Sequence, residues 1–394
     1  MQQVAAHVWT QRIPGATVTI ATPFPHRDAP HYALATVVRS RRRNLPLATV
    51  HLGLLALART LGFRLRRYRF SSEIDAMCRA DVVVDLSGDM LTEDYGLLVG
   101  YSHMLPLMQA LLLGKPLFVC AQSIGPFNRL EALAKAVLSR AAMVTVREHI
   151  SEQLVRGLGL DSDKCRKTAD LAFLLEPAKE DRTLELLEYE GIPPCPPKRV
   201  RLGVSVSALL SNRNNRHLKN GLGSLSTLAS ALDVLATECD IEFMLVPHVF
   251  GPRDKADDRH ACLALTQEMT TPVHMINGEY RPEELKGIIA TCDAFVGCRM
   301  HANIAALDSE VPTLAIGYSH KTAGIMGELG VPEWVVPVES LKVSTFLPML
   351  RRLLDEREAY KDTLKDRLPG IRDRSIENLI LLPVPPLSNI GTST

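Results

Sequence analysis

Short runs of β-branched and aliphatic residues alternate along the chain with longer stretches whose apolar positions recur every three or four residues. The first pattern is typical of strands and the second of amphipathic helices. Their regular alternation predicts parallel sheets covered by helices on both faces. In the first half we expect strands at 17–21, 82–86, 117–121 and 143–146, a weaker strand at 64–68, and helices at 47–61, 96–113, 130–141 and 151–158.

The alternation stops between Leu175 and Arg199 and then starts again. This segment contains GIPPCPPKR, whose prolines can neither continue a helix nor enter the centre of a sheet. We therefore predict an N-terminal doubly wound α/β domain at 1–178, a linker at 179–199, a C-terminal doubly wound α/β domain at 200–370 and a tail at 371–394. In the second domain we expect strands at 200–206, 241–246, 273–276, 294–296 and 313–316, followed by a charged helical region at 338–367.

The composition narrows the class of protein. A chain of 394 residues with 46% hydrophobic and 23% charged residues can bury two cores. Its formal net charge of +1 argues against a nucleic-acid-binding protein, which normally carries a basic excess. The longest apolar stretch, Met104 to Ala121, is interrupted by polar residues and proline, so we interpret it as a buried helix followed by a strand and not as a membrane span. The N-terminus lacks the pattern of a signal peptide. The eight scattered cysteines form no C-x-x-C pair, so we expect a cytoplasmic protein with reduced thiols and no metal site.

The segment TCDAFVGCRMHANIAAL contains the clearest candidate site. In open α/β sheets, ligands bind beyond the carboxyl ends of the strands, and here Arg299 and His301 follow a strand at the start of an apolar helix. The helix N-terminus and a guanidinium together favour a phosphate or carboxylate, with His301 beside them as a proton donor. The alternative is a surface arginine and a histidine packed into the helix start.

Other polar residues follow neighbouring strands of the same domain. Lys321 comes after the strand at 313–316 and could hold a second anionic group, although a solvated lysine is the usual finding at such a turn. His248 follows the strand at 241–246, and Ser205 and Ser207 end the strand at 200–206. Their side chains could contact an oxyanion, and an ordinary loop role is the alternative.

The first domain offers polar strand ends of a different kind. Ser87, Gly88 and Asp89 follow one strand and suit a sugar hydroxyl, which a carboxylate can bind or deprotonate. Gln122 and Ser123 follow the next strand, and Arg147 with Glu148 follows the third. A buried ion pair between Arg147 and Glu148, or a glutamate at a helix N-terminus, is the structural alternative.

Several of these motifs together resemble a known family. SGDMLTEDYG, AQSIGPF, the VREHISEQLVRGLG helix, CDAFVGCRMHANIAAL and YSHK with the following glycines look like those of the polysaccharide pyruvyl transferases, in order across roughly residues 80–330. Members of that family move a pyruvyl group from phosphoenolpyruvate onto a sugar. The resemblance implies two Rossmann-like domains in the arrangement of the GT-B glycosyltransferases, with a central cleft.

The resemblance also implies roles for the candidate residues. Phosphoenolpyruvate carries a phosphate and a carboxylate, and the matching cations are Arg147, Arg299 and Lys321, joined on the donor side by Ser205, Ser207 and His248. His301 matches the family's catalytic histidine, and Asp89 is the candidate for orienting the acceptor hydroxyl. Ser87, Gly88, Gln122 and Ser123 are the implied acceptor contacts. Phosphoenolpyruvate is a co-substrate, and no other cofactor is implied.

The start of the chain departs from the family pattern. The family usually opens with an apolar strand and a turn resembling N-x-G-D-E, whereas this sequence begins inside what resembles the first helix, and 17–21 takes the place of the second strand. We therefore expect the first domain to lack its first strand. Two other functions stay open, namely a glycosyltransferase that uses a nucleotide sugar and a non-catalytic sugar-binding homologue.

A basic run lies at Arg39, Arg41, Arg42 and Arg43. Its ordinary interpretation is a solvated face. Because sugar acceptors of the resembled family are often lipid-linked, the alternative is a peripheral contact with an anionic membrane.

Overall fold

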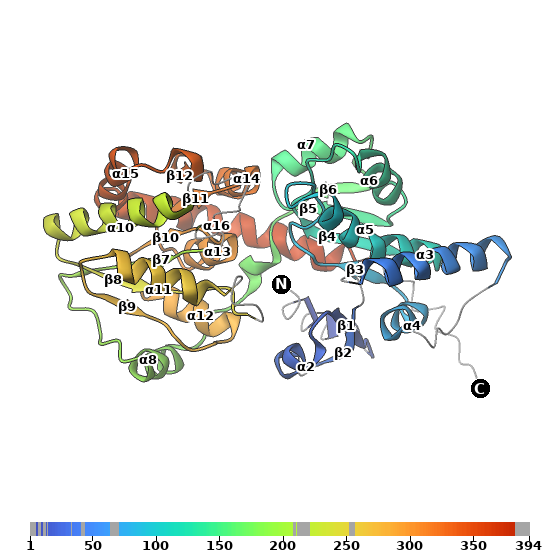
Figure 1. Cartoon of the computed structure of the whole chain (residues 1–394), viewed down its shortest axis with the longest axis horizontal. Helices are drawn as coiled ribbons and strands as arrows, with labels where there is room; N and C mark the ends of the chain where they lie inside the picture. The colour runs from blue at the N-terminus through green and yellow to red at the C-terminus, as the bar shows by residue number, and fades with distance from the viewer. Residues whose placement is uncertain are drawn as a thin grey trace. The chain divides into compact units, whose positions relative to one another are not determined.

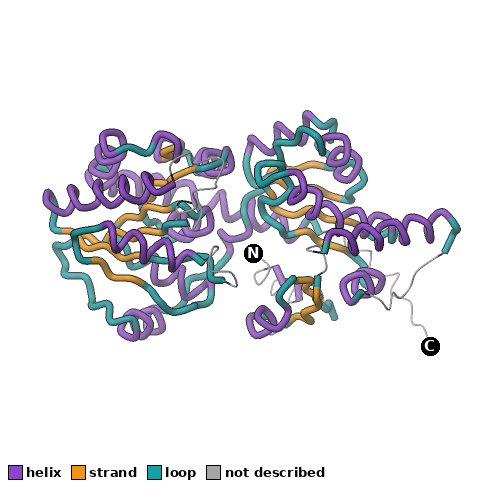
Figure 2. The backbone as a smooth tube through the Cα atoms, viewed as in Figure 1, coloured by secondary structure: helices purple, strands orange, loops and turns teal. Residues whose placement is uncertain are grey.

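The computed structural model describes residues 5–6, 9–10, 13, 15–32, 34–40, 44–63, 71–207, 210, 221–251 and 257–382. The chain divides into two compact units (Figures 1 and 2). Unit 1 contains residues 1–174 and 372–394, and unit 2 contains Leu175–Ile371. The weak strand expected at 64–68 and the arginines at 41–43 lie outside the described residues.

Unit 1 contains a four-stranded parallel sheet with the order β3-β4-β5-β6. Strand β4 is buried at all six positions, as expected for a parallel strand covered on both faces. The strands are β3 (Val83–Asp85), β4 (Leu117–Gln122), β5 (Met143–Val146) and β6 (Cys165–Lys167), and the helices are α4 (Ser72–Arg79), α5 (Leu97–Leu112), α6 (Glu131–Leu138) and α7 (His149–Gly157), with a 3-10 turn η2 (Leu171–Leu174).

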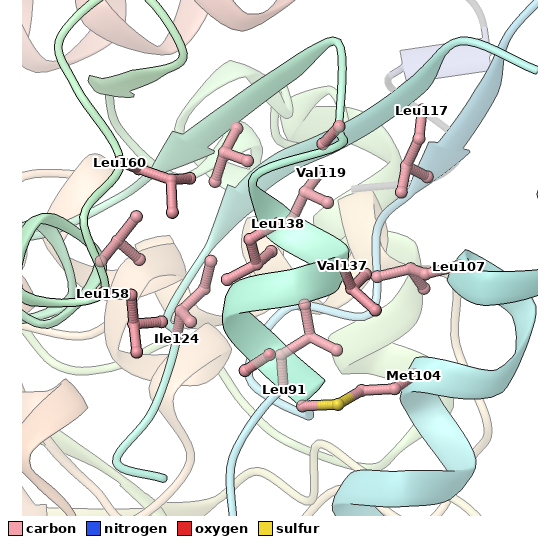
Figure 3. Packing of buried hydrophobic residues seen from close by; sticks show 14 of the residues in the cluster. Leu91, Met104, Leu107, Leu117, Val119, Ile124, Val137, Leu138, Leu158 and Leu160 are labelled. Atoms are coloured by element: carbon pink, nitrogen blue, oxygen red, sulfur yellow. The ribbon is translucent and has the colours of Figure 1, made fainter. Parts of the chain in front are cut away.

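The core of unit 1 forms where these helices meet the sheet. Val137 and Leu138 of α6 lie between Val119 of β4 and Leu107 of α5, within a cluster of buried aliphatic side chains (Figure 3). The spacing of such residues along α6 places them on one face, which is why the helix packs with that side against the sheet.

The start of unit 1 differs from the prediction. The strand expected at 17–21 is β1 (Val18–Thr22), but it pairs in parallel with β2 (Ala35–Arg39) and not with the larger sheet in the described parts of the chain. The sequence analysis did not predict β2. All five residues of β1 pair with residues of β2, from Val18 with Ala35 to Thr22 with Arg39. The other elements here are α2 (Pro25–Asp28), η1 (Ala29–His31) and α3 (Leu45–Thr60).

Unit 2 contains a six-stranded parallel sheet with the order β12-β11-β10-β7-β8-β9. Its strands are β7 (Val200–Ser205), β8 (Ile241–Leu245), β9 (Val273–Met275), β10 (Ala294–Gly297), β11 (Thr313–Gly317) and β12 (Val335–Pro337). Its helices are α8 (Glu180–Tyr189), α10 (Gly221–Glu238), α11 (Asp258–Glu268), α12 (Pro282–Ala290), α13 (Met300–Asp308), α14 (His320–Glu328) and α15 (Val343–Asp355), with η4 (Pro332–Trp334) and η5 (Val338–Ser340). All five strands predicted for this domain are present, and β12 was not predicted.

The expected linker and tail both differ from the structure. The segment 179–199 is not an open linker, because it contains α8. The apolar side of α8 packs on α12, and Leu186, Leu187 and Ile192 are buried in the core of unit 2. Helix α16 (Arg357–Ile380) runs from unit 2 into unit 1. Its last turns belong to unit 1, where Asn378 is fully buried and bonds the Thr145 and Thr168 hydroxyls.

No helix among the described residues is both long and apolar enough to cross a membrane.

Candidate functional site

The sheet order of unit 2 places the ends of the predicted strands next to one another. Strand β7 lies between β8 and β10, and Ser205 at the end of β7 is in register with Gly297 at the end of β10. His248 follows β8, Arg299 follows β10, and Lys321 follows β11, the next strand. Because all these strands are parallel, the predicted donor residues share one edge of the sheet.

Arg299 is held in a fixed position by a carboxylate that the sequence analysis did not single out. Its Nε and Nη2 atoms donate to the two carboxylate oxygens of Asp258 at 2.9 and 2.6 Å. The Asp258 side chain is fully buried, whereas 17% of the Arg299 side chain stays exposed. Burial lowers the pKa of Arg299, but the hydrogen bond and charge of Asp258 outweigh this effect and raise it. The guanidinium is therefore a permanent, oriented cation with one accessible side.

Two histidines lie within electrostatic reach of each other and of this guanidinium. Burial, and after it the electrostatic effect of His301 and Arg299, lowers the pKa of His248 to about 3. His248 is therefore neutral at physiological pH. His301 lies in the first turn of α13, two positions after Arg299, which is the helix N-cap and has an extended backbone. The N-terminus of α13 adds the positive end of a helix dipole to this edge.

Buried polar atoms without a hydrogen-bond partner in the described parts of the chain occur at this edge, and two of them belong to predicted donor residues. They are Oγ of Ser205 and Nδ1 of His248. Buried polar groups are nearly always satisfied in folded proteins, so such an atom is a place where a water, an ion or a polar ligand can bind. Ser205 and Ser207 are both fully buried. The pair Ser205 and His248 thus marks a place where a polar ligand can complete the hydrogen bonding.

Gly297 is required for this geometry. A Cβ atom at Gly297 would lie 1.8 Å from Oδ1 of Asn303, and Nδ2 of Asn303 donates to the Gly297 carbonyl at 3.1 Å. The side chain of Asn303 therefore fastens the first turn of α13 to the end of β10. This contact fixes the direction in which Arg299 and His301 leave the sheet.

Lys321 lies in the first turn of α14 and is 2% exposed. A buried ammonium group is costly unless neighbouring groups compensate it. The structure thus differs from the ordinary solvated lysine at a strand-to-helix turn. Its position after β11 puts a second cation on the same sheet edge as Arg299.

Unit 1 has its own polar sheet edge, built around Asp85. Nε2 of Gln122 donates to the Asp85 carboxylate at 2.6 Å, and the Ser87 hydroxyl bonds Asp85 at 3.0 Å and Gln122 Oε1 at 3.1 Å. The register of β4 and β5 shifts between Val119 and Gln122, and Ala121 has a φ of 51°, in the left-handed region. Backbone irregularities of this kind redirect a side chain at a strand end.

The predicted acceptor residues Gly88, Asp89 and Ser123 lie on this same edge. The carboxylate of Asp89 accepts a hydrogen bond from the Tyr95 hydroxyl at 2.6 Å. Gly88 has a φ of 79°, and its carbonyl accepts from the Ser123 amide at 2.8 Å. The structure therefore brings all five residues predicted for the acceptor side to the ends of β3 and β4, namely Ser87, Gly88, Asp89, Gln122 and Ser123.

Arg147 lies in unit 1, apart in the chain from the other predicted donor cations. Its Nη1 donates to Asp170 at 2.5 Å and its Nε to the Ser123 hydroxyl at 2.8 Å, and both charged side chains are buried. Glu148, which was considered as its partner, instead accepts from the amides of Ile150 and Ser151 at the start of α7. Arg147 is thus committed to an internal ion pair, an arrangement that favours a structural role.

Within the residues that the structure describes, no three His, Cys, Asp or Glu side chains are grouped to hold a metal ion. The cations and hydroxyls of unit 2 and the carboxylates and amides of unit 1 are instead suited to binding an anion and a polyol, respectively.

The sequence matches the model of a known family over residues 14–320, most of its length. The chain belongs to the polysaccharide pyruvyl transferase family. This finding confirms the resemblance inferred from the motifs, all of which begin within the matched range. Membership in the polysaccharide pyruvyl transferases supports a transferase that acts in polysaccharide biosynthesis.

A curated member of similar sequence is the amylovoran biosynthesis protein AmsJ of Erwinia amylovora. It is 25% identical over 341 residues, which cover 80% of this chain and 75% of AmsJ. Both chains therefore share most of their length.

Solved structures of similar fold have little sequence identity to this member of the family. The UDP-GlcNAc 2-epimerase of Neisseria meningitidis, bound to UDP-GlcNAc, has a TM-score of 0.59 at 12% identity and covers 96% of this chain and 95% of its own. Anabaena HepE, in complex with UDP and glucose, has a TM-score of 0.52 at 13% identity over 97% and 95% of the two chains. These likenesses concern the fold alone. They confirm the predicted α/β class with two Rossmann-like domains, as in the GT-B proteins.

Proposed function

We propose that this protein transfers a pyruvyl group from phosphoenolpyruvate to a sugar of a polysaccharide or its precursor, where it forms a cyclic pyruvate ketal. The observation that carries the proposal is the oriented guanidinium of Arg299, braced by buried Asp258 and next to His248 and His301 at the N-terminus of α13. Family membership supports the transferase class.

The donor carries a phosphate and a carboxylate, so its site needs more than one cation. Arg299 and Lys321 follow adjacent strands of unit 2, and the α13 N-terminus contributes backbone amides. The buried hydroxyl of Ser205 and Nδ1 of His248 supply further polar contacts. We leave Arg147 out of this site, because Asp170 already neutralises its charge inside unit 1.

The chemistry requires a proton on the methylene carbon of the enol. In the proposed reaction, His301 donates that proton while a sugar hydroxyl adds to the neighbouring carbon and loses its own proton. The bond from this carbon to the phosphate oxygen then breaks, phosphate leaves, and a second hydroxyl of the same sugar adds to close the ring with loss of its proton. Because His248 is neutral, it adds no second positive charge beside His301.

The acceptor role falls to unit 1. Asp89, with Tyr95 fixing one of its oxygens, is the proposed group that orients the reacting hydroxyl. Ser87, Gly88, Gln122 and Ser123 supply alternating donors and acceptors, a combination that matches sugar hydroxyls. Asp85, which the sequence analysis did not single out, holds the Gln122 amide in place.

Isothermal titration separates this function from its alternatives. The protein is titrated with phosphoenolpyruvate, with UDP-glucose and UDP-GlcNAc, and with a free sugar, and Arg299→Ala serves as the matched variant. We expect binding of phosphoenolpyruvate that Arg299→Ala weakens strongly. Binding of a nucleotide sugar without phosphoenolpyruvate would instead support a glycosyltransferase. Binding of sugar alone would support a non-catalytic homologue.

A further inference from the structure

Helix α3 is apolar around nearly its whole circumference. Its sequence, LPLATVHLGLLALART, contains one charged residue, Arg59. Ala48, His51 and Leu55 are buried on one face, and α3 packs on α5. A helix that is apolar on all sides normally lies in a protein core or against lipid. The second face of α3 does neither within the described structure.

The outer α3 face consists of Val50, Leu54, Leu57 and Leu61. Their exposed fractions are 57%, 50%, 56% and 63%, respectively. The spacing of three and four residues aligns them in one stripe along the helix. The stripe starts at a shallow hollow lined by Leu45, Pro46, Thr49 and Val50, and Phe63, 67% exposed, follows its end. Contiguous exposed apolar surface of this kind marks an interaction site.

The charge of the surrounding sequence identifies the kind of partner. Residues 29–72 contain nine arginines and no aspartate, glutamate or lysine. The whole chain has a formal net charge of +1, so the rest of the protein is acidic overall. Arg39 and Arg59 are among the described residues, and the other seven arginines count only as charge carried by this stretch of the sequence. A partner of this region must therefore tolerate a concentrated positive charge.

We propose that the outer α3 face docks on an anionic membrane surface. The four aliphatic side chains enter the headgroup region, and the positive charge of the stretch 29–72 attracts the anionic lipid. With 16 residues, α3 is about 24 Å long and cannot cross a bilayer. An interfacial helix needs only an apolar face and a basic surrounding, because apolar insertion and electrostatic attraction together give stable binding.

A second copy of the chain fits this face less well than a membrane does. In a two-fold symmetric interface the same surface meets itself, so two segments with nine arginines each would be brought together. Like charges at an interface oppose association, whereas anionic lipid attracts both. The inference does not depend on pyruvyl transfer.

The test is flotation of the full chain with liposomes of phosphatidylcholine alone or with phosphatidylglycerol added. We expect binding to the anionic liposomes only, weakened by high salt. Leu54→Gln with Leu57→Gln should reduce it by about tenfold or more, because two inserted apolar groups are lost. The matched control is Leu184→Gln with Leu263→Gln on α8 and α11, whose 51% and 50% exposure is similar. It should bind like the unchanged protein.

Circular dichroism and thermal unfolding of both double variants check that they fold, and exposed leucine-to-glutamine changes should leave the melting temperature nearly unchanged. Absence of binding, equal binding to neutral liposomes, or equal flotation of the two double variants would overturn the proposal. Light scattering measures the oligomeric state and so tests whether a second copy of the chain occupies this face. If the unchanged protein formed a dimer but did not float, and only the Leu54→Gln with Leu57→Gln variant were monomeric, the face would belong to an interface with a second copy. That result would also overturn the membrane proposal.

Discussion

The guanidinium of Arg299 and the carboxylate of Asp258 meet through two hydrogen bonds of 2.9 and 2.6 Å at the edge of the sheet in unit 2. Asp258 also accepts from the Val249 amide at 3.0 Å, so the loop after β8 and the turn after β10 are tied together. Arg299 is thus oriented before any ligand binds. Preorganisation of a cation reduces the entropy that ligand binding would otherwise lose.

Asp258→Asn should therefore affect both stability and binding. Loss of the buried carboxylate leaves the largely buried Arg299 without its counter-charge and should lower the free energy of unfolding by about 3 kcal/mol. Phosphoenolpyruvate should also bind more weakly, because the guanidinium is no longer fixed. Urea unfolding and titration measure the two effects. Asp257→Asn is the matched control for binding, since the neighbouring Asp257 bonds Arg259 instead. Unchanged binding in Asp258→Asn would contradict the positioning role.

His301→Asn should separate binding from turnover. If His301 is the proton donor, the variant binds phosphoenolpyruvate with nearly the original affinity but turns over about 10² times more slowly. Phosphate release with an acceptor sugar measures kcat, and titration measures Kd. His260→Asn, which changes an exposed histidine of the same unit, should leave both unchanged. Full turnover in His301→Asn would remove the proton-donor role.

His248 should make the folded protein sensitive to acid. Its pKa is lowered to about 3, mainly by burial, whereas an unfolded histidine titrates near about 6.5. Between these values the unfolded chain binds a proton that the folded protein does not. The contribution to stability is therefore complete above about pH 6.5 and is lost as the pH falls toward 3, with a slope of at most about 1.4 kcal/mol per pH unit.

Urea unfolding between about pH 7.5 and about pH 5 tests this sign. The unchanged protein should lose stability faster with acid than His248→Gln does. His260→Gln provides the comparison for an exposed histidine and should follow the unchanged protein. Parallel stability curves for all three proteins would show that His248 does not titrate differently in the folded state.

The Arg147–Asp170 pair allows a test of structural against donor-binding roles. Arg147→Met leaves Asp170 buried without its ion pair and should lower the free energy of unfolding by about 3–5 kcal/mol. The double variant Arg147→Met with Asp170→Leu removes both charges and should regain most of that stability. We expect the double variant to keep phosphoenolpyruvate binding. A stable double variant that no longer binds phosphoenolpyruvate would return Arg147 to the donor site.

The strands that the sequence predicts best are those buried on both faces. Strands β4, β7 and β8 are five or six residues long, mostly apolar and buried at nearly every position. Strands β6 (CRK) and β12 (VVP) have three residues each and depend mainly on their neighbours in the sheet. Strand β2 pairs with β1 in a separate two-stranded sheet of the described residues. Short strands depend on tertiary pairing, which a local pattern does not record.

Site residues, too, were predictable where a local pattern marks them and not where a distant partner does. Arg299 and His301 were predictable because strand, turn and helix start are adjacent in the sequence. Asp258 was not, because it lies 41 positions from Arg299 and the pairing depends on how β10 and β8 flank β7. Arg147 was assigned to the donor from its local turn, while its partner Asp170 lies 23 positions away. Ion-pair partners of this kind are set by the fold.

Helix α16 has a consequence for the order of events during synthesis. Unit 1 is assembled from two separate stretches of chain, and Ser375 and Asn378 of the second stretch bond Asp170, Thr145 and Ala169 inside it. Unit 2 is one continuous stretch. Domains fold as units while the ribosome extends the chain. Unit 1 is translated first, but it cannot complete its core until the end of α16 has been made. Unit 2 is translated second and can complete its core before unit 1 does.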